Sequence, residues 1–326
     1  VPTAPPVTPG PETARPRSSG PAGAPLPETF ESEDFVVTFA KAGDTAAGLA
    51  ARFLGDVGKA WMVEDHNGAA AFEPGHEVVI PKHPWNLSGV GPTGYQIVPI
   101  LVYHNLGPQS KGRLTIGVAT FEEQMRYLKT QGYRVINLNA FLEFASLRRQ
   151  LPRKSVVLTF DDGWKPFREF AYPILKELGF TATLFIYTDF VGSRSALSWD
   201  EIRQLGQEGF QIEAHSKTHS DLRRRQGESE AEYAHRMQAE LIQPLALFQR
   251  HLGRTSQILA YPYGAQDDDL LKRLKEHGYA AALTVRRQGA QSFVPLLTIH
   301  RSQIYSEMSL EDFAKNLNVF NEEPIR

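Results

Sequence analysis

The chain has 326 residues, a length that corresponds to two or three domains. Its 35 basic and 37 acidic side chains give a formal charge of −2, so no overall field favours nucleic acid or an anionic membrane surface. The absence of cysteine excludes thiol nucleophiles, disulfides and thiolate metal sites, and any metal ion must be held by histidine and carboxylate. No apolar run approaches the roughly 18 residues of a membrane span, so we expect no transmembrane segment.

Residues 1–33 are predicted to be a disordered, proline-rich tether. Nine of the 22 prolines lie in the first 30 residues, and no aromatic side chain occurs before Phe30. Such a segment buries too little apolar surface to offset the entropy lost on ordering. It serves either as a passive linker or as a proline-rich ligand for a partner domain.

Residues 34–83 are predicted to form a small βααβ domain. Its expected elements are a strand, a helix capped by Thr45, a second helix and a second strand, at Phe35–Phe39, 45–53, 59–65 and 77–80. This order resembles the LysM carbohydrate-binding module, as do the Gly43-Asp44-Thr45 turn and the Asn after the second helix. The resemblance implies binding of glycans that contain N-acetylglucosamine. The alternative is a degenerate module that acts as a spacer or packs against its neighbour.

Residues 84–96 are predicted to be an interdomain linker. Gly89 to Gly94 match the dinucleotide-binding pattern G-x-G-x-x-G. That loop requires a strand before it and a helix that opens at the last glycine. Here Pro92 lies inside the pattern and an apolar strand follows it, so we do not interpret it as a nucleotide site.

Residues 97–326 are predicted to form an irregular (β/α) barrel of about seven strands. Apolar runs that favour strands alternate with amphipathic segments such as 121–130 and 172–178. The alternative architecture is a doubly wound open sheet. The predicted strands are 99–103, 134–138, 155–160, 181–187, 210–214, 257–261, 280–285 and 295–299.

Reactive side chains follow five of these strands. They are Asp161-Asp162-Gly163, His215 with His219 four residues later, Pro262-Tyr263-Gly264, His104 and His300. The carboxyl ends of barrel strands are where enzymes of this architecture assemble their sites. One carboxylate with two imidazoles is a ligand set suited to Zn²⁺ or another divalent first-row ion. A neighbouring carboxylate can then act on the water that such an ion activates.

Three motifs in this domain resemble those of the polysaccharide deacetylase family with the NodB homology domain, carbohydrate esterase family 4. They are Thr159-Phe160-Asp161-Asp162-Gly163, His215-Ser216-Lys217-Thr218-His219 and Tyr261-Pro262-Tyr263-Gly264. Two further segments, Val102-Tyr103-His104 and Leu197-Ser198-Trp199-Asp200, are similar to the branch that acts on poly-N-acetylglucosamine. The resemblance implies metal-dependent removal of N-acetyl groups from a glycan.

The resemblance also implies roles for individual residues. Asp161 is expected to be the general base, and Asp162, His215 and His219 the ligands of one divalent metal, for which the family pattern favours zinc, with cobalt, nickel or iron as alternatives. The backbone N–H of Tyr263 is expected to stabilise the oxyanion.

Two positions depart from the family pattern, and one role has two candidates. Ala260 occupies the place of the arginine that orients the base, and Arg301 could supply that charge from another strand. The fourth-motif tryptophan has no counterpart, because all four tryptophans lie upstream. The general acid that protonates the leaving amine is His104 or His300, of which we favour His104.

The expected function is hydrolysis of N-acetyl groups of an extracytoplasmic polysaccharide. Alternatives are a glycan-binding protein without turnover and a relative that cleaves esters or cyclic amides. The substrate would be poly-N-acetylglucosamine, another exopolysaccharide or peptidoglycan. Because the chain starts at Val1, we expect a removed upstream segment, such as a signal peptide with or without a lipid anchor.

Overall fold

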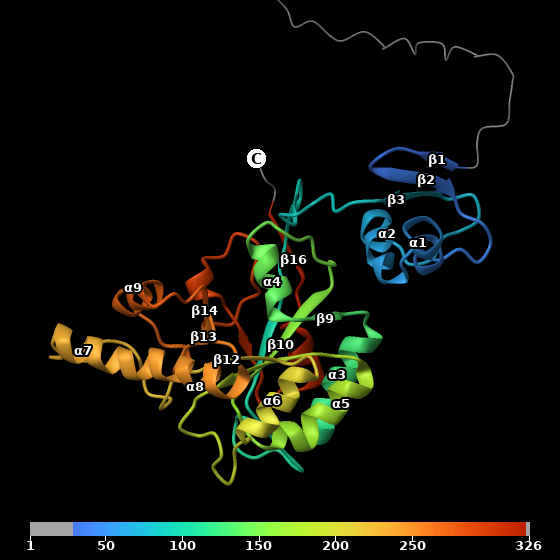
Figure 1. The fold of residues 1–326 in the computed structure, drawn as a ribbon. Helices are drawn as coiled ribbons and strands as arrows, with labels where there is room; N and C mark the ends of the chain where they lie inside the picture. Colours follow the sequence, from blue (N-terminus) through green and yellow to red (C-terminus); the bar gives the residue numbers. More distant parts are fainter. Residues whose placement is uncertain (1–28, 324–326) are drawn as a thin grey trace, which may run out of the picture.

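The computed structural model describes residues 29–323, which form a small N-terminal domain and a larger α/β domain (Figure 1). An extended segment joins the two domains (Figure 1). The predicted disorder of residues 1–28 lies outside the described part of the chain. Across residues 29–323, none of the helices combines the length and the apolarity needed to cross a bilayer.

The small domain is a three-stranded antiparallel sheet with two helices. Its strands, in the order in which they pair, are β1 (Thr29–Glu31), β2 (Phe35–Phe39) and β3 (Glu77–Pro81), and its helices are α1 (Ala46–Leu54) and α2 (Ala60–Asn67). The predicted βααβ order is confirmed. Strand β1 is a correction, because it lies in the segment predicted to be a disordered tether. Ser32 Oγ accepts hydrogen bonds from the backbone N–H groups of Asp34 and Phe35, and this turn folds β1 back onto β2.

Local signals fix the ends of the two helices. Thr45 Oγ1 accepts a hydrogen bond from Gly48 N at 3.1 Å and caps α1 as predicted. Asn67 ends α2, and its side-chain amide exchanges two hydrogen bonds with the backbone of Val79 in β3. This asparagine therefore ties the second helix to the sheet.

The larger domain is built on a curled parallel sheet. Its strands are β6 (Ile100–Tyr103), β9 (Arg134–Ile136), β10 (Ser155–Asp162), β11 (Thr183–Ile186), β12 (Gln211–Ala214), β13 (Ile258–Ala260), β14 (Ala281–Leu283) and β15 (Ser302–Gln303). The strand order is β14-β13-β12-β11-β10-β6-β15, and β9 pairs with the first half of β10. Ile299 bridges to Leu283 in β14, and β15, which begins at Ser302, pairs with β6. A five-residue stretch therefore touches both ends of the sheet, and the predicted irregular barrel is confirmed.

Three hydrophobic clusters hold this domain together. One lies between the outer face of the sheet and α3 (Val118–Thr130), α5 (Tyr172–Leu178), α6 (Trp199–Gln207) and α10 (Leu310–Ala314). A second packs α7 (Glu230–Met237), α8 (Gln243–Leu252) and α9 (Asp268–Glu276) against β12, β13 and β14. The third joins α4 (Leu138–Ala145) to side chains from β6, β10, β11, β13 and β14. Because strands from both halves of the sheet contribute to this third cluster, it fills the inside of the curl.

The predicted linker at residues 84–96 is partly an ordered hairpin. Strands β4 (Val90–Gly91) and β5 (Gly94–Gln96) pair with each other, and β5 also pairs with β16 (Phe320–Glu322). A Cβ on Gly94 would lie 2.0 Å from the Asn321 carbonyl oxygen, so the close approach of β16 requires glycine there. A strand, not a helix, begins at this last glycine, in agreement with the prediction that the pattern is no dinucleotide loop.

Two short strands lie outside the main sheet, and one predicted strand does not form. Strands β7 (Asn105–Gly107) and β8 (Thr115–Gly117) form a separate parallel pair. The predicted strand at 295–299 is wrong, since Leu296–Thr298 is a 3₁₀ turn. We expect from the sequence that His300 follows a barrel strand, and this is wrong. His300 instead follows the 3₁₀ turn and precedes β15.

Candidate active site

Five of the predicted site residues lie at the carboxyl edge of the main sheet. Asp161 and Asp162 end β10, and His104, His215 and Tyr263 follow β6, β12 and β13. The strands are parallel, so these ends lie along one edge of the sheet.

Asp162, His215 and His219 converge on one point. Asp162 Oδ1 lies 3.6 Å from His215 Nε2 and 3.4 Å from His219 Nε2. One ligand atom from each of the three residues lies within 4.8 Å of the others. Trp164 Nε1 donates a hydrogen bond to Asp162 Oδ2 at 2.9 Å, whereas the buried Oδ1 has no hydrogen-bond partner among the described residues. The free oxygen is the one that faces the two imidazoles.

The imidazole of His215 is oriented by a backbone carbonyl. Its Nδ1 lies 2.7 Å from the carbonyl oxygen of Ala260. Because a carbonyl can only accept, Nδ1 carries the proton and Nε2 presents its lone pair toward Asp162. Burial lowers the pKa of His215, which favours this neutral form. A carbonyl partner of this kind is the usual support of a metal-ligating histidine.

These three side chains fit a divalent transition-metal ion. Bonds from zinc to imidazole nitrogen or carboxylate oxygen are about 2.0–2.2 Å long, so ligand atoms around one tetrahedral ion lie about 3.3–3.6 Å apart. The two separations measured from Asp162 Oδ1 match that spacing. A bound cation would also satisfy the buried oxygen that otherwise lacks a partner.

Unusual backbone conformations concentrate at this site. Asp162, Ser216, His219 and Tyr263 have positive φ angles of 77°, 71°, 61° and 61°, and Leu147 is the only other non-glycine residue between 29 and 323 that does. Such conformations cost free energy and persist where the surrounding structure holds them. The spacing of His215 and His219 is that of one helical turn, but the segment between them is a loop.

Asp161 is held by a buried arginine from the segment that precedes β15. Arg301 Nη1 and Nη2 donate to the two carboxylate oxygens of Asp161 at 2.7 and 2.8 Å. Arg301 also donates to the Thr284 carbonyl oxygen and to Thr159 Oγ1, and its exposed fraction is 0%. Burial alone would raise the pKa of Asp161, but the charge and the hydrogen bonds of the Arg301 guanidinium outweigh it and lower that pKa to about 2. The carboxylate is therefore ionised at neutral pH.

Comparison with known proteins identifies the family of this domain. Residues 148–282 match the sequence profile of the polysaccharide deacetylase family. The larger domain is a polysaccharide deacetylase domain. The match contains Asp161, Asp162, His215, His219 and Tyr263, whereas His104, His300 and Arg301 lie outside it.

Relatives and solved structures agree with this assignment. YxkH of Bacillus subtilis, named as a polysaccharide deacetylase, is 26% identical over 212 residues, which are 65% of this chain and 73% of YxkH. The poly-β-1,6-N-acetyl-D-glucosamine N-deacetylase of Staphylococcus aureus is 29% identical over 174 residues, 50% of this chain and 59% of that enzyme. The structure of deacetylase PplD from Streptococcus pyogenes in complex with acetate has a TM-score of 0.62 and 26% identity, and covers 69% of this chain and 100% of PplD. The deacetylase domain is thus a hydrolase domain.

Residues that sequence reasoning did not single out support the His215–His219 loop of the deacetylase domain. The buried carboxylate of Glu240 accepts hydrogen bonds from the backbone N–H groups of Lys217 and Thr218 and from the Thr218 hydroxyl. No local pattern marks Glu240, because it follows the loop by more than twenty positions. Trp164, which holds Asp162, directly follows the Asp-Asp-Gly motif and could have been noticed from that position.

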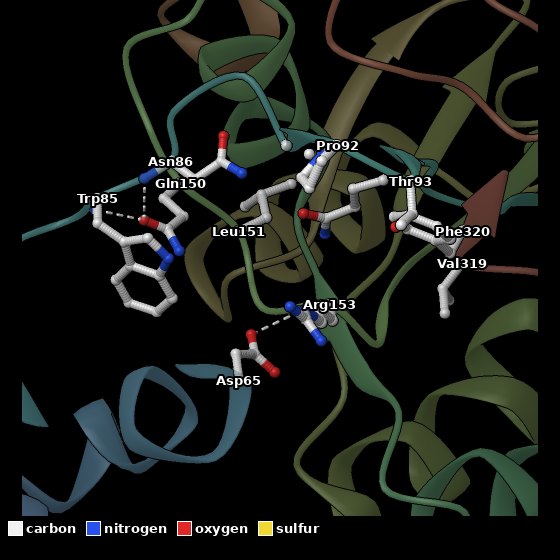
Figure 2. Close-up of a pocket in the computed structure, with 13 residues that line it drawn as sticks. Asp65, Trp85, Asn86, Pro92, Thr93, Gln150, Leu151, Arg153, Val319 and Phe320 are labelled. Carbon is white, nitrogen blue, oxygen red and sulfur yellow. Dashed lines mark hydrogen bonds between the residues drawn. The ribbon is translucent and has the colours of Figure 1, made fainter. Parts of the chain in front are cut away.

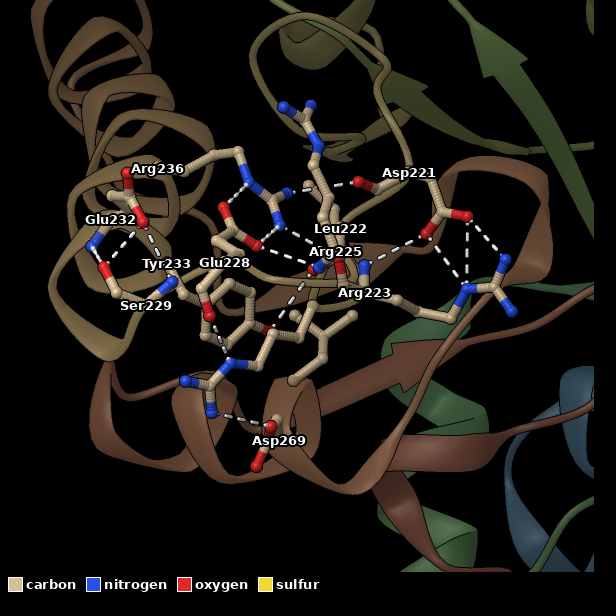
Figure 3. Close-up of polar contacts among 12 residues, drawn as sticks. Asp221, Leu222, Arg223, Arg225, Glu228, Ser229, Glu232, Tyr233, Arg236 and Asp269 are labelled. Carbon is tan, nitrogen blue, oxygen red and sulfur yellow. Dashed lines mark hydrogen bonds and ion pairs between the residues drawn. The ribbon is translucent and has the colours of Figure 1, made fainter.

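The segment after His219 is pinned by an arginine on α7 (Figure 3). Arg236 Nε and Nη2 each donate to the carboxylate of Glu228 at 2.7 Å, and its guanidinium also bonds the carbonyl oxygens of Asp221 and Arg223. These contacts lower the pKa of Glu228 to about 2. This half-buried ion pair thus fixes the loop that follows the candidate metal site.

The two candidate general acids lie in different surroundings. His104 has a buried Nδ1 with no hydrogen-bond partner among residues 29–323, and its charge contributes to lowering the pKa of Asp161. His300 lines a separate cavity with Thr284 and Arg286, and burial together with Arg286 lowers its pKa. Of the two histidines, His104 is the one whose position affects the pKa of the Asp161 carboxylate.

Proposed function

We propose that this protein hydrolyses the N-acetyl groups of N-acetylglucosamine units in a polysaccharide, releasing acetate, in a metal-dependent reaction. The observation that carries the proposal is the convergence of Asp162, His215 and His219 beside the ionised Asp161 in a polysaccharide deacetylase domain. The named activity of the staphylococcal relative supports N-acetylglucosamine as the sugar.

The roles proposed for the residues follow from their contacts. Asp162 Oδ1 and the Nε2 atoms of His215 and His219 hold the metal, for which an oxygen and two neutral nitrogens favour zinc over harder cations. Cobalt, nickel and iron are the alternatives. A divalent ion held there supplies Lewis acidity and lowers the pKa of water.

The proton transfers fall to this chain's own side chains. Asp161 accepts the proton of the attacking water, with the two lone pairs that its fork with Arg301 leaves free. Arg301 is a positioning residue for this carboxylate. The backbone N–H of Tyr263 stabilises the oxyanion, and His104 protonates the amine as it leaves.

We further propose an extracytoplasmic location, because polymers of N-acetylglucosamine lie outside the cytoplasm. Poly-N-acetylglucosamine, another exopolysaccharide and peptidoglycan remain the substrate classes to compare. The small domain, residues 34–83, is proposed to be a LysM-like glycan-binding module. Its βααβ order and the Asn67 bridge support this assignment.

Acetate release from defined oligosaccharides tests the proposal. The chain is assayed after metal removal and after zinc is restored, on N-acetylglucosamine oligomers, peptidoglycan fragments and acetylated xylan. We expect release from the N-acetylglucosamine oligomers with restored metal, and none from Asp161→Asn although its zinc content is unchanged. Glycan retention without release would indicate a binding protein, and release from acetylated xylan alone would indicate an esterase.

A further inference from the structure

The small domain and the deacetylase domain enclose a pocket between them (Figure 2). Asp65 of α2 accepts a hydrogen bond from the backbone N–H of Arg153 at 2.9 Å, and Glu64 pairs with Arg134 at 2.8 Å. The joining segment is fixed as well, since Gln150 Oε1 accepts from the backbone N–H groups that precede the hairpin β4–β5. These contacts shape a cavity of about 330 Å³, a size that suits one or two sugar rings.

The lining of this pocket has the chemistry of a site for an uncharged, hydroxyl-rich ligand. Its one acid, Asp65, is balanced by its one base, Arg153, and its remaining polar side chains are mostly amides, from Asn86, Gln96 and Gln150. The balanced charge disfavours a strongly anionic or cationic ligand. Amides offer donors and acceptors of the kind that sugar hydroxyl and acetamide groups bind. Asn86 and Gln96 use their amide nitrogens on the carbonyl oxygens of Val90 and Pro152, so the amide nitrogen of Gln150 is the donor left for a ligand.

Two exposed aromatic side chains flank the pocket. Trp85 and Phe320 have exposed fractions of 41% and 36%, and lie on opposite sides of the pocket in Figure 2. Trp61 of α2 stacks with Trp85 at a centroid distance of 6.4 Å, which extends the aromatic surface onto the small domain. Exposed aromatic faces bury the apolar face of a pyranose ring, and amides at their edge bind its hydroxyls.

Two polar groups that line the pocket are free to bind a ligand. Neither the amide nitrogen of Gln150 nor the guanidinium of Arg153 has a hydrogen-bond partner within residues 29–323. Both groups line the cavity, so they offer donors to a ligand.

The pocket lies at the far end of β10 from the candidate metal site. Arg153 precedes the first residue of this strand by two positions, and Asp162 is its last residue. A strand of eight residues at about 3.3 Å per residue separates the two sites by about 26 Å. A sugar in the pocket therefore cannot be the unit that loses its acetyl group.

We infer that this interdomain pocket binds pyranose units of an uncharged polysaccharide and anchors the polymer while its other units are deacetylated. The inference rests on the proposed function for the identity of the polymer. Two linked binding sites on one chain raise the local concentration of substrate at the second site once the first is filled. Short oligomers that reach only one site gain nothing from this effect.

The test compares a polymer with a short oligomer in the full zinc-loaded chain. The variants are Trp85→Ala and Phe320→Ala, and the control is Leu87→Ala, which removes a side chain of 40% exposure from the same joining segment outside the pocket lining. The probes are fully acetylated poly-β-1,6-N-acetylglucosamine and its dimer. Binding is measured by sedimentation with the polymer, and turnover by acetate release.

We expect each pocket variant to bind the polymer about fivefold to tenfold more weakly and to raise its KM, as loss of one aromatic contact predicts. Acetate release from the dimer should stay at the level of the parent and of Leu87→Ala. Unchanged polymer affinity in both pocket variants would overturn the inference even if deacetylation is normal. Absence of acetate release in the parent would instead reject the proposed function, and the sedimentation result would still decide whether the pocket binds the polymer.

Discussion

Replacement of Arg301 by methionine should destabilise the deacetylase domain and impair turnover without loss of the metal. The arginine is fully buried and forms two hydrogen bonds with Asp161, one with Thr159 and one with the Thr284 carbonyl oxygen. Its removal leaves a buried carboxylate without a partner. Breaking a buried ion pair in this way costs about 3–5 kcal/mol.

The expected loss is large on the scale of protein stability. A domain of this size is stable by about 5–15 kcal/mol, and each kcal/mol shifts the midpoint of thermal unfolding by about 2–4 °C. We therefore expect Arg301→Met to unfold about 6–20 °C below the parent. The matched control is Arg126→Met, because Arg126 pairs with Glu122 and Glu177 at the surface, where solvent screens an ion pair and leaves it little effect on stability.

Turnover separates a positioning role from a purely structural one. Arg301 contacts Asp161 but none of the three candidate ligands, so zinc content and KM should stay at the parent values while kcat falls about 100-fold. Arg301→Lys keeps the positive charge but cannot form both hydrogen bonds with Asp161, so its kcat should lie between those of the parent and of Arg301→Met. In the double variant Asp161→Asn/Arg301→Met, part of the stability should return, because no unpaired charge is left. A midpoint within 2 °C of the parent, or loss of zinc in proportion to kcat, would refute the reasoning.

Three further predictions concern the general acid, the metal and the loop after the site. His104→Ala should lower kcat at least 100-fold while His300→Ala changes it less than tenfold, measured as acetate release; the reverse order would assign the acid to His300. Dialysis against a chelator should abolish acetate release and lower the thermal midpoint, and added zinc should restore both; activity that survives with no metal detected by elemental analysis would contradict the assignment. Because the Arg236 contacts lower the pKa of Glu228 from 4.5 to about 2, the stability that this pair contributes is complete above about pH 4.5 and lost as the pH falls toward 2. Glu228→Gln should therefore cost about 1 kcal/mol in urea unfolding at pH 7 and almost nothing near pH 2, and an equal cost at both would be inconsistent with the ion pair.

The parts of the fold that sequence reasoning predicted are those set by local pattern. The apolar run at 155–160 corresponds to a buried strand with neighbours on both edges, and its end places Asp161 and Asp162 at the carboxyl edge of the sheet. The same rule, that parallel strands gather their carboxyl ends, predicted that His215 would lie near them. Burial on both faces is what makes such strands visible in a sequence.

The parts that it missed depend on distant partners. The hairpin at 90–96 is stabilised by β16, which lies more than 220 residues later in the chain. The sequence of the hairpin itself does not indicate that this strand pairs with it. In the segment 295–299, Leu297 packs among the outer helices, whereas Ile299 packs inside the barrel. These apolar side chains therefore belong to two different hydrophobic clusters, and the segment does not form a strand. An apolar run shows that a segment is buried, but not which surface buries it.

Closure of the barrel and support of Asp161 are achieved by one short segment. Ile299 bridges to β14, Ser302 begins the pairing with β6, and Arg301 between them turns inward to the carboxylate of Asp161. Arg301 thus contacts Asp161 from the segment that joins the two ends of the curled sheet. We propose that Arg301 takes the role of the arginine that the family pattern predicts at position 260, where this chain has alanine. The backbone carbonyl of Ala260 orients His215, while the positive charge beside Asp161 comes from Arg301.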